Sequence, residues 1–163
     1  QFNLSVLLIT HEMDVIKTLA DQVAILDQGK VIEQAKVFDL FFKPKTSIAR
    51  SFVRSALSVE LPTALADKVQ SQLPMGGCML WRFTFAGQVA KEPVISHVIQ
   101  CFSIELNIIR ANLETVHKQS LGVMIVALRG DQDNISQAKR YLEEKGVNIE
   151  VIGYVATDDL AIY

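Results

Sequence analysis

The stretch LGVMIVAL, residues 121–128, limits the possible folds of this chain more than any other. It holds no charged residue and no proline, which predicts a buried β-strand. Alternate side chains of a strand point to opposite faces, and here both sets are apolar. One set is Leu121, Val123, Ile125 and Ala127, and the other is Met124, Val126 and Leu128. We therefore expect both faces of the sheet to be covered. Three covers fit the second face: another copy of the domain, the connector before it, or an apolar ligand.

Residues 78–155 supply the rest of this sheet. The predicted elements are, in order, a strand at 78–85, a helix beginning near Pro93, strands at 104–115 and 121–128, a helix capped by Asp131 or Asp133, and a strand at 147–154. The order βαββαβ predicts an α+β fold of the ferredoxin-like type, in which two helices cover one face of a four-stranded sheet. Residues 156–163 follow as a C-terminal tail.

Residues 1–57 form a different unit. The predicted elements are a buried strand at 4–10, a helix at 12–20, a hairpin over 23–34 that turns at Gly29, and helices at 36–42 and 48–57. Such a string has no complete core, so we expect an incomplete α/β remnant of a larger domain, and the missing initiator methionine suggests a fragment. Residues 58–77 are a connector, with a short helix from Pro62 to about Gln72.

Composition excludes several classes of function. The formal net charge of −2 gives no electrostatic footprint for nucleic acid, and 121–128 lacks the aromatic and basic residues of an RNA-recognition strand. Cys78 and Cys101 have no metal-ligand spacing, so we expect reduced thiols and no metal site. We see neither a signal peptide nor an apolar run of about 20 residues. The basic group Lys43, Lys45, Arg50 and Arg54 is interpreted as a solvated helix face.

His11 follows the first predicted strand directly, where ligands of open α/β sheets bind. The surrounding stretch, LLITHEMDVIKTLADQVAILDQGKVIEQ, resembles the end of the ATP-binding domain of ABC transporters. This resemblance implies that His11 is the switch histidine, with Asp21 and Gly29 at matching positions. In the full-length parent, which would bind ATP and Mg, its imidazole would contact the γ-phosphate and position the attacking water.

The other ATPase motifs are not found in this sequence. It has no G-x-x-x-x-G-K-[ST] loop, no LSGGQ signature and no acidic Walker B strand. We therefore expect no cofactor in this chain and no ATP hydrolysis by the chain alone.

The remaining sequence resembles one branch of these transporters. KPKTSIARSFVRSAL and the βαββαβ pattern are similar to the ATP-binding subunits of bacterial methionine importers, which carry a C-terminal NIL domain. Asn107-Ile108-Ile109 stands where the family has its Asn-Ile-Leu tripeptide. The resemblance implies a homodimeric subunit that is peripheral on the cytoplasmic face of the bacterial inner membrane and is joined to a transmembrane permease. Methionine bound to the NIL domain would inhibit import when the cytoplasmic pool is high.

Four residues are candidates for the methionine site. Asn107 offers an amide that can donate to and accept from a zwitterion. Met124, Ile108 and Ile109 offer an apolar, polarizable slot for a thioether. The ordinary alternatives are a local backbone hydrogen bond for Asn107 and core packing for Met124.

Two other functions fit the same pattern. One is an ACT-like amino-acid-binding module of a biosynthetic enzyme, although residues 1–57 have no reason to precede such a module. The other is a dimerisation domain that binds no ligand. Calorimetry with L-methionine, with leucine as the control, separates them from methionine sensing.

Overall fold

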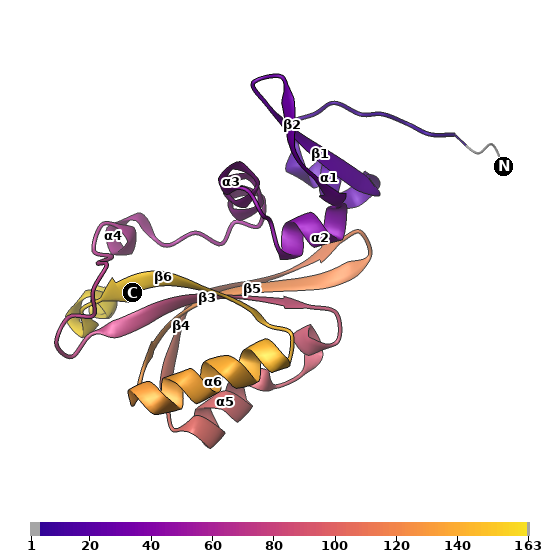
Figure 1. Cartoon of the computed structure of the whole chain (residues 1–163). Helices are drawn as coiled ribbons and strands as arrows, with labels where there is room; N and C mark the ends of the chain where they lie inside the picture. Colours follow the sequence, from indigo (N-terminus) through magenta and orange to yellow (C-terminus); the bar gives the residue numbers. More distant parts are fainter. Residues whose placement is uncertain (1–3, 163) are drawn as a thin grey trace.

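The computed structural model describes residues 4–162 of the chain. Its centre is an antiparallel sheet of β3 (Cys78–Ala86), β4 (Glu105–Val116), β5 (Gln119–Arg129) and β6 (Asn148–Val155), in the order β4-β5-β3-β6. Helices α5 (Val94–Phe102) and α6 (Gln132–Glu144) lie together on one face (Figure 1). This is the predicted ferredoxin-like arrangement, with a short 3₁₀ turn, η1 (Val89–Lys91), before α5.

The face under α5 and α6 holds an aromatic core. Trp81, Phe83 and Phe85 alternate along β3 and meet edge to face, with ring centroids about 6 Å apart. They pack against Val126 and Leu128 of β5. The alternation predicted for both strands is therefore confirmed on this side of the sheet.

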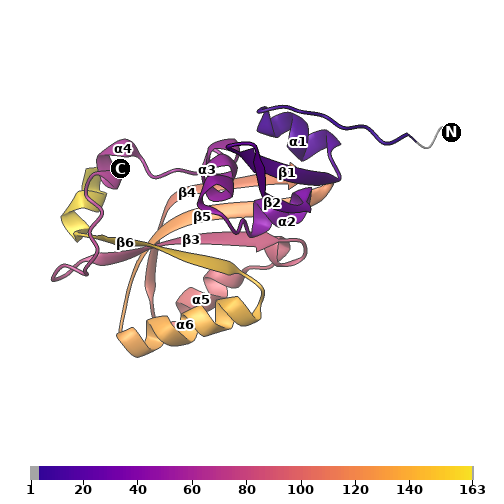
Figure 2. The ribbon, with the colours of Figure 1, turned by 45° about the horizontal axis from the view of Figure 1, so that its top comes forward.

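The opposite face is covered by segments that precede the sheet in the sequence. Helices α2 (Val37–Phe42) and α3 (Ser47–Ala56) lie over it, followed by the connector (Figure 2). Leu121, Val123 and Ile125 of β5 share a buried cluster with Phe41 and Val53. Near the far end, Leu65 packs on Leu80 and Ala127. The connector was one of the three predicted covers, and the helices of residues 1–57 complete it.

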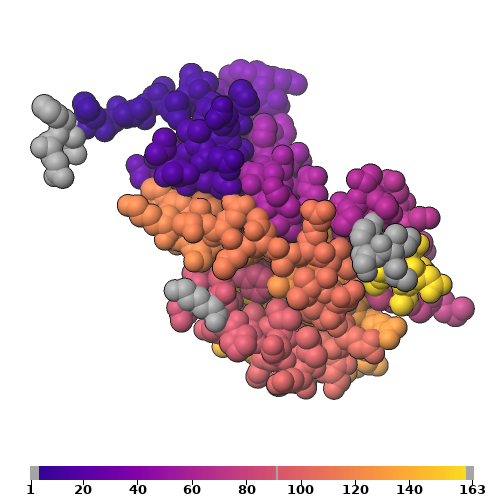
Figure 3. All heavy atoms as spheres, turned by 180° about the vertical axis from the view of Figure 1, so that it is seen from behind, coloured from indigo at the N-terminus to yellow at the C-terminus, as the bar shows by residue number. Residues whose placement is uncertain are grey.

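The N-terminal elements form a second layer above α2. A two-stranded sheet joins β1 (Gln22–Asp27) to β2 (Lys30–Lys36) through a turn at Gln28 and Gly29, which both have positive φ. Helix α1 (Met13–Leu19) reaches the β4–β5 turn, where the His117 N–H donates to the Lys17 carbonyl oxygen. Figure 3 shows the indigo N-terminal atoms against the orange atoms of the sheet. The hairpin was predicted at this position and is confirmed.

Residues 4–10 do not form the predicted buried strand. They have no regular structure, and Leu7 is 91% exposed. A buried strand needs neighbouring strands on both sides to pair its N–H and C=O groups. The described residues offer this stretch no such neighbours, so its apolar composition alone does not produce a strand.

The connector is less helical than predicted. Helix α4 covers only Thr63–Ala66 rather than extending to Gln72. After α4, the backbone of Gln70 forms hydrogen bonds with Tyr154 of β6 as an isolated β-bridge. This extended pairing is incompatible with a helix that continues to Gln72. The C-terminal tail forms a 3₁₀ helix, η2 (Thr157–Ile162), close to α4 (Figure 1).

Candidate functional site

The predicted methionine-binding residues lie on two faces of the sheet, and β4 carries a β-bulge among them. Ile108 pairs with Val126 and Arg110 pairs with Ile125, so Ile109 is the extra residue between them. Ile108 and Met124 belong to the α5–α6 side of the sheet, because their cross-strand neighbours lie in that core. Asn107, opposite Ala127, and Ile109 belong to the side covered by the connector. The four residues therefore do not line one cavity within a single chain.

Their exposures differ in the same way. Asn107 and Ile108 are exposed on β4, which is an edge strand, and the Ile108 side chain is 52% accessible. Ile109 and Met124 are half-buried. Leu113, on the same face as Ile108, is 66% exposed, so this edge presents apolar side chains together with unpaired backbone groups.

Met124 lines an apolar cavity of about 390 Å³ between η1, α5 and the strands β4 and β5. Phe85, Val94, Ile95 and Leu113 form much of its wall. The charged side chain of Glu92 also lies at this cavity. We name it the Met124 cavity. Its size and lining suit a small apolar group.

His11 is not part of a cluster of functional side chains among the described residues. It is exposed, in a bend immediately before α1, and no cluster of three metal-ligating side chains occurs within residues 4–162. Its predicted role needs phosphate-binding parts that this sequence lacks, so it stays a prediction for a longer parent protein.

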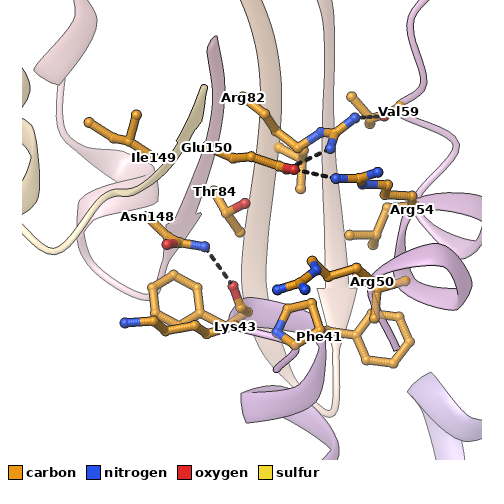
Figure 4. Close-up of a pocket in the computed structure, with 15 residues that line it drawn as sticks. Phe41, Lys43, Arg50, Arg54, Val59, Arg82, Thr84, Asn148, Ile149 and Glu150 are labelled. Atoms are coloured by element: carbon orange, nitrogen blue, oxygen red, sulfur yellow. Dashed lines mark hydrogen bonds and ion pairs between the residues drawn. The ribbon is translucent and has the colours of Figure 1, made fainter. Parts of the chain in front are cut away.

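A second cavity, of about 300 Å³, lies between α2, α3 and the sheet (Figure 4). We name it the basic cavity, because Lys43, Arg50, Arg54 and Arg82 line it together with a single carboxylate, Glu150. Lys43 follows α2, two arginines come from α3, and Arg82 rises from β3. The two cavities lie on opposite faces of the same sheet, since Phe85 and Met124 line one and Arg82 and Thr84 line the other.

Glu150 bridges two of these arginines. Its Oε2 accepts a hydrogen bond from Arg82 Nη1 at 2.7 Å, and its Oε1 accepts one from Arg54. Arg82 is deeply placed, and burial lowers the pKa of its guanidinium despite the attraction of Glu150. Arg82 Nε is shielded from solvent and has no hydrogen-bond partner among the described residues.

The sequence analysis missed this second cavity. The basic group Lys43, Lys45, Arg50 and Arg54 is predicted to be a solvated helix face, and all but Arg54 are exposed. Lys43, Arg50 and Arg54 nevertheless line this cavity. One signal was available: Arg82 is the only charged residue in the otherwise apolar strand CMLWRFTFA. A charge inside a buried strand requires a partner or a polar cavity.

Comparison with known proteins identifies the domain that forms the four-stranded sheet. The model of the NIL domain matches residues 79–151, from the second residue of β3 into β6. The chain carries a NIL domain. The predicted NIL domain is therefore confirmed over residues 79–151.

Relatives of the NIL-containing chain extend the match to the N-terminal elements. It is 46% identical over 159 residues to the methionine import ATP-binding protein MetN of Coxiella burnetii, covering 98% of this chain and 45% of that protein. It is 38% identical to the protein of the same name from Rhodospirillum rubrum, with the same coverage of each chain. The matched part is the C-terminal region of these proteins, so the chain spans less than half of their length.

One of the matching solved structures is similar to part of this chain. The C-terminal domain of an ABC transporter ATP-binding protein from Enterococcus faecalis shares 35% sequence identity, with a TM-score of 0.41. The match covers 46% of this chain and 83% of that one.

Proposed function

We propose that this chain is the regulatory C-terminal region of a methionine importer's ATP-binding subunit, and that its NIL domain binds methionine. The observation that carries the proposal is the Met124 cavity, an apolar space inside the matched NIL domain and next to the open edge of β4. The relatives' printed name, methionine import ATP-binding protein, supplies the ligand class.

The chemistry of the cavity fits the two ends of methionine. Met124 and the apolar wall would surround the thioether, which gains from contact with polarizable and aromatic groups such as Phe85. The zwitterionic end would remain at the strand edge, where unpaired backbone N–H and C=O groups of β4 are available. Ile108 lies on the same face as Met124 and would extend the apolar surface.

Asn107 and Ile109 fit this site through a second copy of the chain. Both lie on the other face of β4, so they would meet a ligand where two such edges come together. The exposed Ile108 and Leu113 are suited to burial in that homodimer. Methionine held between two subunits would favour one arrangement of the pair over the other. Coupling of about 1–3 kcal/mol per effector is typical of such regulation.

In the full-length parent this arrangement would control ATP hydrolysis at the cytoplasmic face of the membrane, beside the permease. His11 would act there as the switch histidine, with ATP and Mg bound to the missing upstream part. No helix within residues 4–162 is long and apolar enough to cross a bilayer.

Isothermal titration of the chain with L-methionine, and with L-leucine as the control, tests the proposal. Binding of methionine should weaken when Met124→Leu removes the sulfur while keeping the volume. Met75→Leu is the matched control, because Met75 is fully exposed in the connector. Heat from neither amino acid would support the ligand-free dimerisation domain, and equal affinity for both would contradict a methionine sensor.

A further inference from the structure

We propose that the basic cavity binds a small organic anion, at a site separate from the Met124 cavity. The ligand would carry a carboxylate or phosphate group on an apolar or aromatic body. Three features of the cavity lead to this ligand class: its charge, the unpaired guanidinium of Arg50, and an apolar wall.

The charge of the cavity is opposite to that of the chain. Its four cationic side chains face one carboxylate, a formal excess of three positive charges, whereas the whole chain carries −2. Lys43 and Arg50 form no ion pair among the described residues. Like charges gathered at a low-dielectric wall repel one another, and they attract an anion to the same place.

Arg50 supplies an unpaired guanidinium at this cavity. Its side chain is exposed and forms no ion pair among the described residues. Glu150 and the Val59 carbonyl oxygen already accept hydrogen bonds from Arg82, and Glu150 also accepts one from Arg54. The planar fork of a guanidinium matches the oxygens of carboxylate and phosphate.

The remaining wall is apolar. Phe41 and Val53 from the helices and Val123 from β5 line it. Thr84 and Asn148 point toward the middle of the cavity and add neutral polar groups (Figure 4). A volume of about 300 Å³ exceeds what an inorganic ion needs. An organic body beside the anionic group would use this space and these contacts.

A ligand in the basic cavity would link the helical cover to the sheet. The cavity lining comes from two separate parts of the sequence, residues 41–59 and residues 82–150. An anion that joins Arg50 of α3 to Arg82 of β3 would hold the helical cover onto the sheet. Because only the folded chain offers this juxtaposition, binding raises the thermal stability.

Calorimetry and thermal unfolding of the whole chain test this site with three anions. The probes are inorganic phosphate, adenosine 5′-monophosphate and 4-methylpentanoate, and the neutral controls are adenosine and 4-methylpentanamide. We expect at least one organic anion to bind and raise the melting temperature, with salt-sensitive affinity, while the neutral controls do not.

Variants locate the binding. Arg50→Gln should weaken the organic anion by roughly tenfold, since one charge-assisted hydrogen-bond partner is lost. Arg140→Gln on α6 is the matched control, because Arg140 is exposed on the opposite side of the sheet and does not line the cavity. No binding of any anion, or equal losses in the two variants, would overturn the proposal. Met124→Leu distinguishes this site from the methionine site, since it should leave anion binding unchanged.

Discussion

Lys17 Nζ lies 2.5 Å from Glu114 Oε2, which joins α1 to β4 across 97 positions of sequence. Asp14 also pairs with Lys17, and Lys17 Nζ donates to the Ala56 carbonyl oxygen at 3.3 Å. The backbone N–H of His117 in the β4–β5 turn donates to the Lys17 carbonyl oxygen at 2.9 Å. The helix that follows His11 is therefore fastened to the NIL domain by both side-chain and backbone contacts.

Replacing Glu114 tests this fastening. Glu114→Gln should lower the free energy of unfolding by roughly 1–3 kcal/mol, because Lys17 is only 8% exposed and would lose one of its two carboxylate partners. Glu105→Gln is the matched control, since Glu105 lies on the same strand and its ion pair with Arg129 is exposed. That control should cost at most about 1 kcal/mol in chemical denaturation. Equal losses would mean that the Lys17 pair contributes nothing specific.

Glu33 should make stability depend on pH. Burial alone would raise the pKa of this carboxyl, but hydrogen bonds from the backbone N–H groups of Lys45 and Thr46 outweigh it and lower the pKa. A lowered pKa contributes stability that is fully present above the unfolded value of about 4.3 and is lost as pH falls through the folded value.

Glu33→Gln measures this contribution. The loss of stability should be largest at neutral pH and should shrink as the solution is acidified below the unfolded pKa. Urea midpoints across this pH range give the measurement, with the exposed Glu144→Gln as the control. A destabilisation that does not change with pH would contradict the assignment.

Phe41 tests the cover on the second face of the sheet. It is 1% exposed, in the cluster that includes Val123 and Ile125. Phe41→Ala should cost about 3–5 kcal/mol of unfolding free energy, while Phe52→Ala on the outer side of α3, where Phe52 is 42% exposed, should cost far less. Similar costs in thermal or urea unfolding would show that α2 does not pack on the sheet in solution.

The chain by itself should not hydrolyse ATP. Its sequence has no phosphate-binding loop and no Walker B carboxylate, and His11 is exposed without phosphate-binding neighbours among the described residues. A phosphate-release assay with Mg and ATP measures this directly, with His11→Ala as the comparison. Turnover that His11→Ala abolishes would contradict the prediction.

Local patterns in the sequence were enough to predict the sheet. Alternation in 78–85 and two-sided apolarity in 121–128 identified buried strands, because these patterns depend only on which faces are covered. The stretch 4–10 has the composition of a buried strand but fails to form one, since strand formation also depends on neighbours.

The cavities could not be predicted in the same way. The basic cavity arises where Arg50 and Arg82, far apart in sequence, are brought together by the packing of α3 on β3. The bulge at Ile109 shifts the register of β4 against β5, and Asn107 and Met124 lie on different faces. A single extra residue in a strand leaves no clear mark in composition or period.

The NIL domain match is shorter than the folded unit that buries both faces of the sheet. The NIL match begins at residue 79, yet the side chains of Leu121, Val123 and Ile125 lie beneath helices that begin at Val37. A fragment that begins at residue 78 would expose this apolar face of the sheet to water. The simplest way to cover it again is association with a second copy of the same fragment. Removing residues 1–77 would therefore change the oligomeric state of the domain before it changed ligand binding.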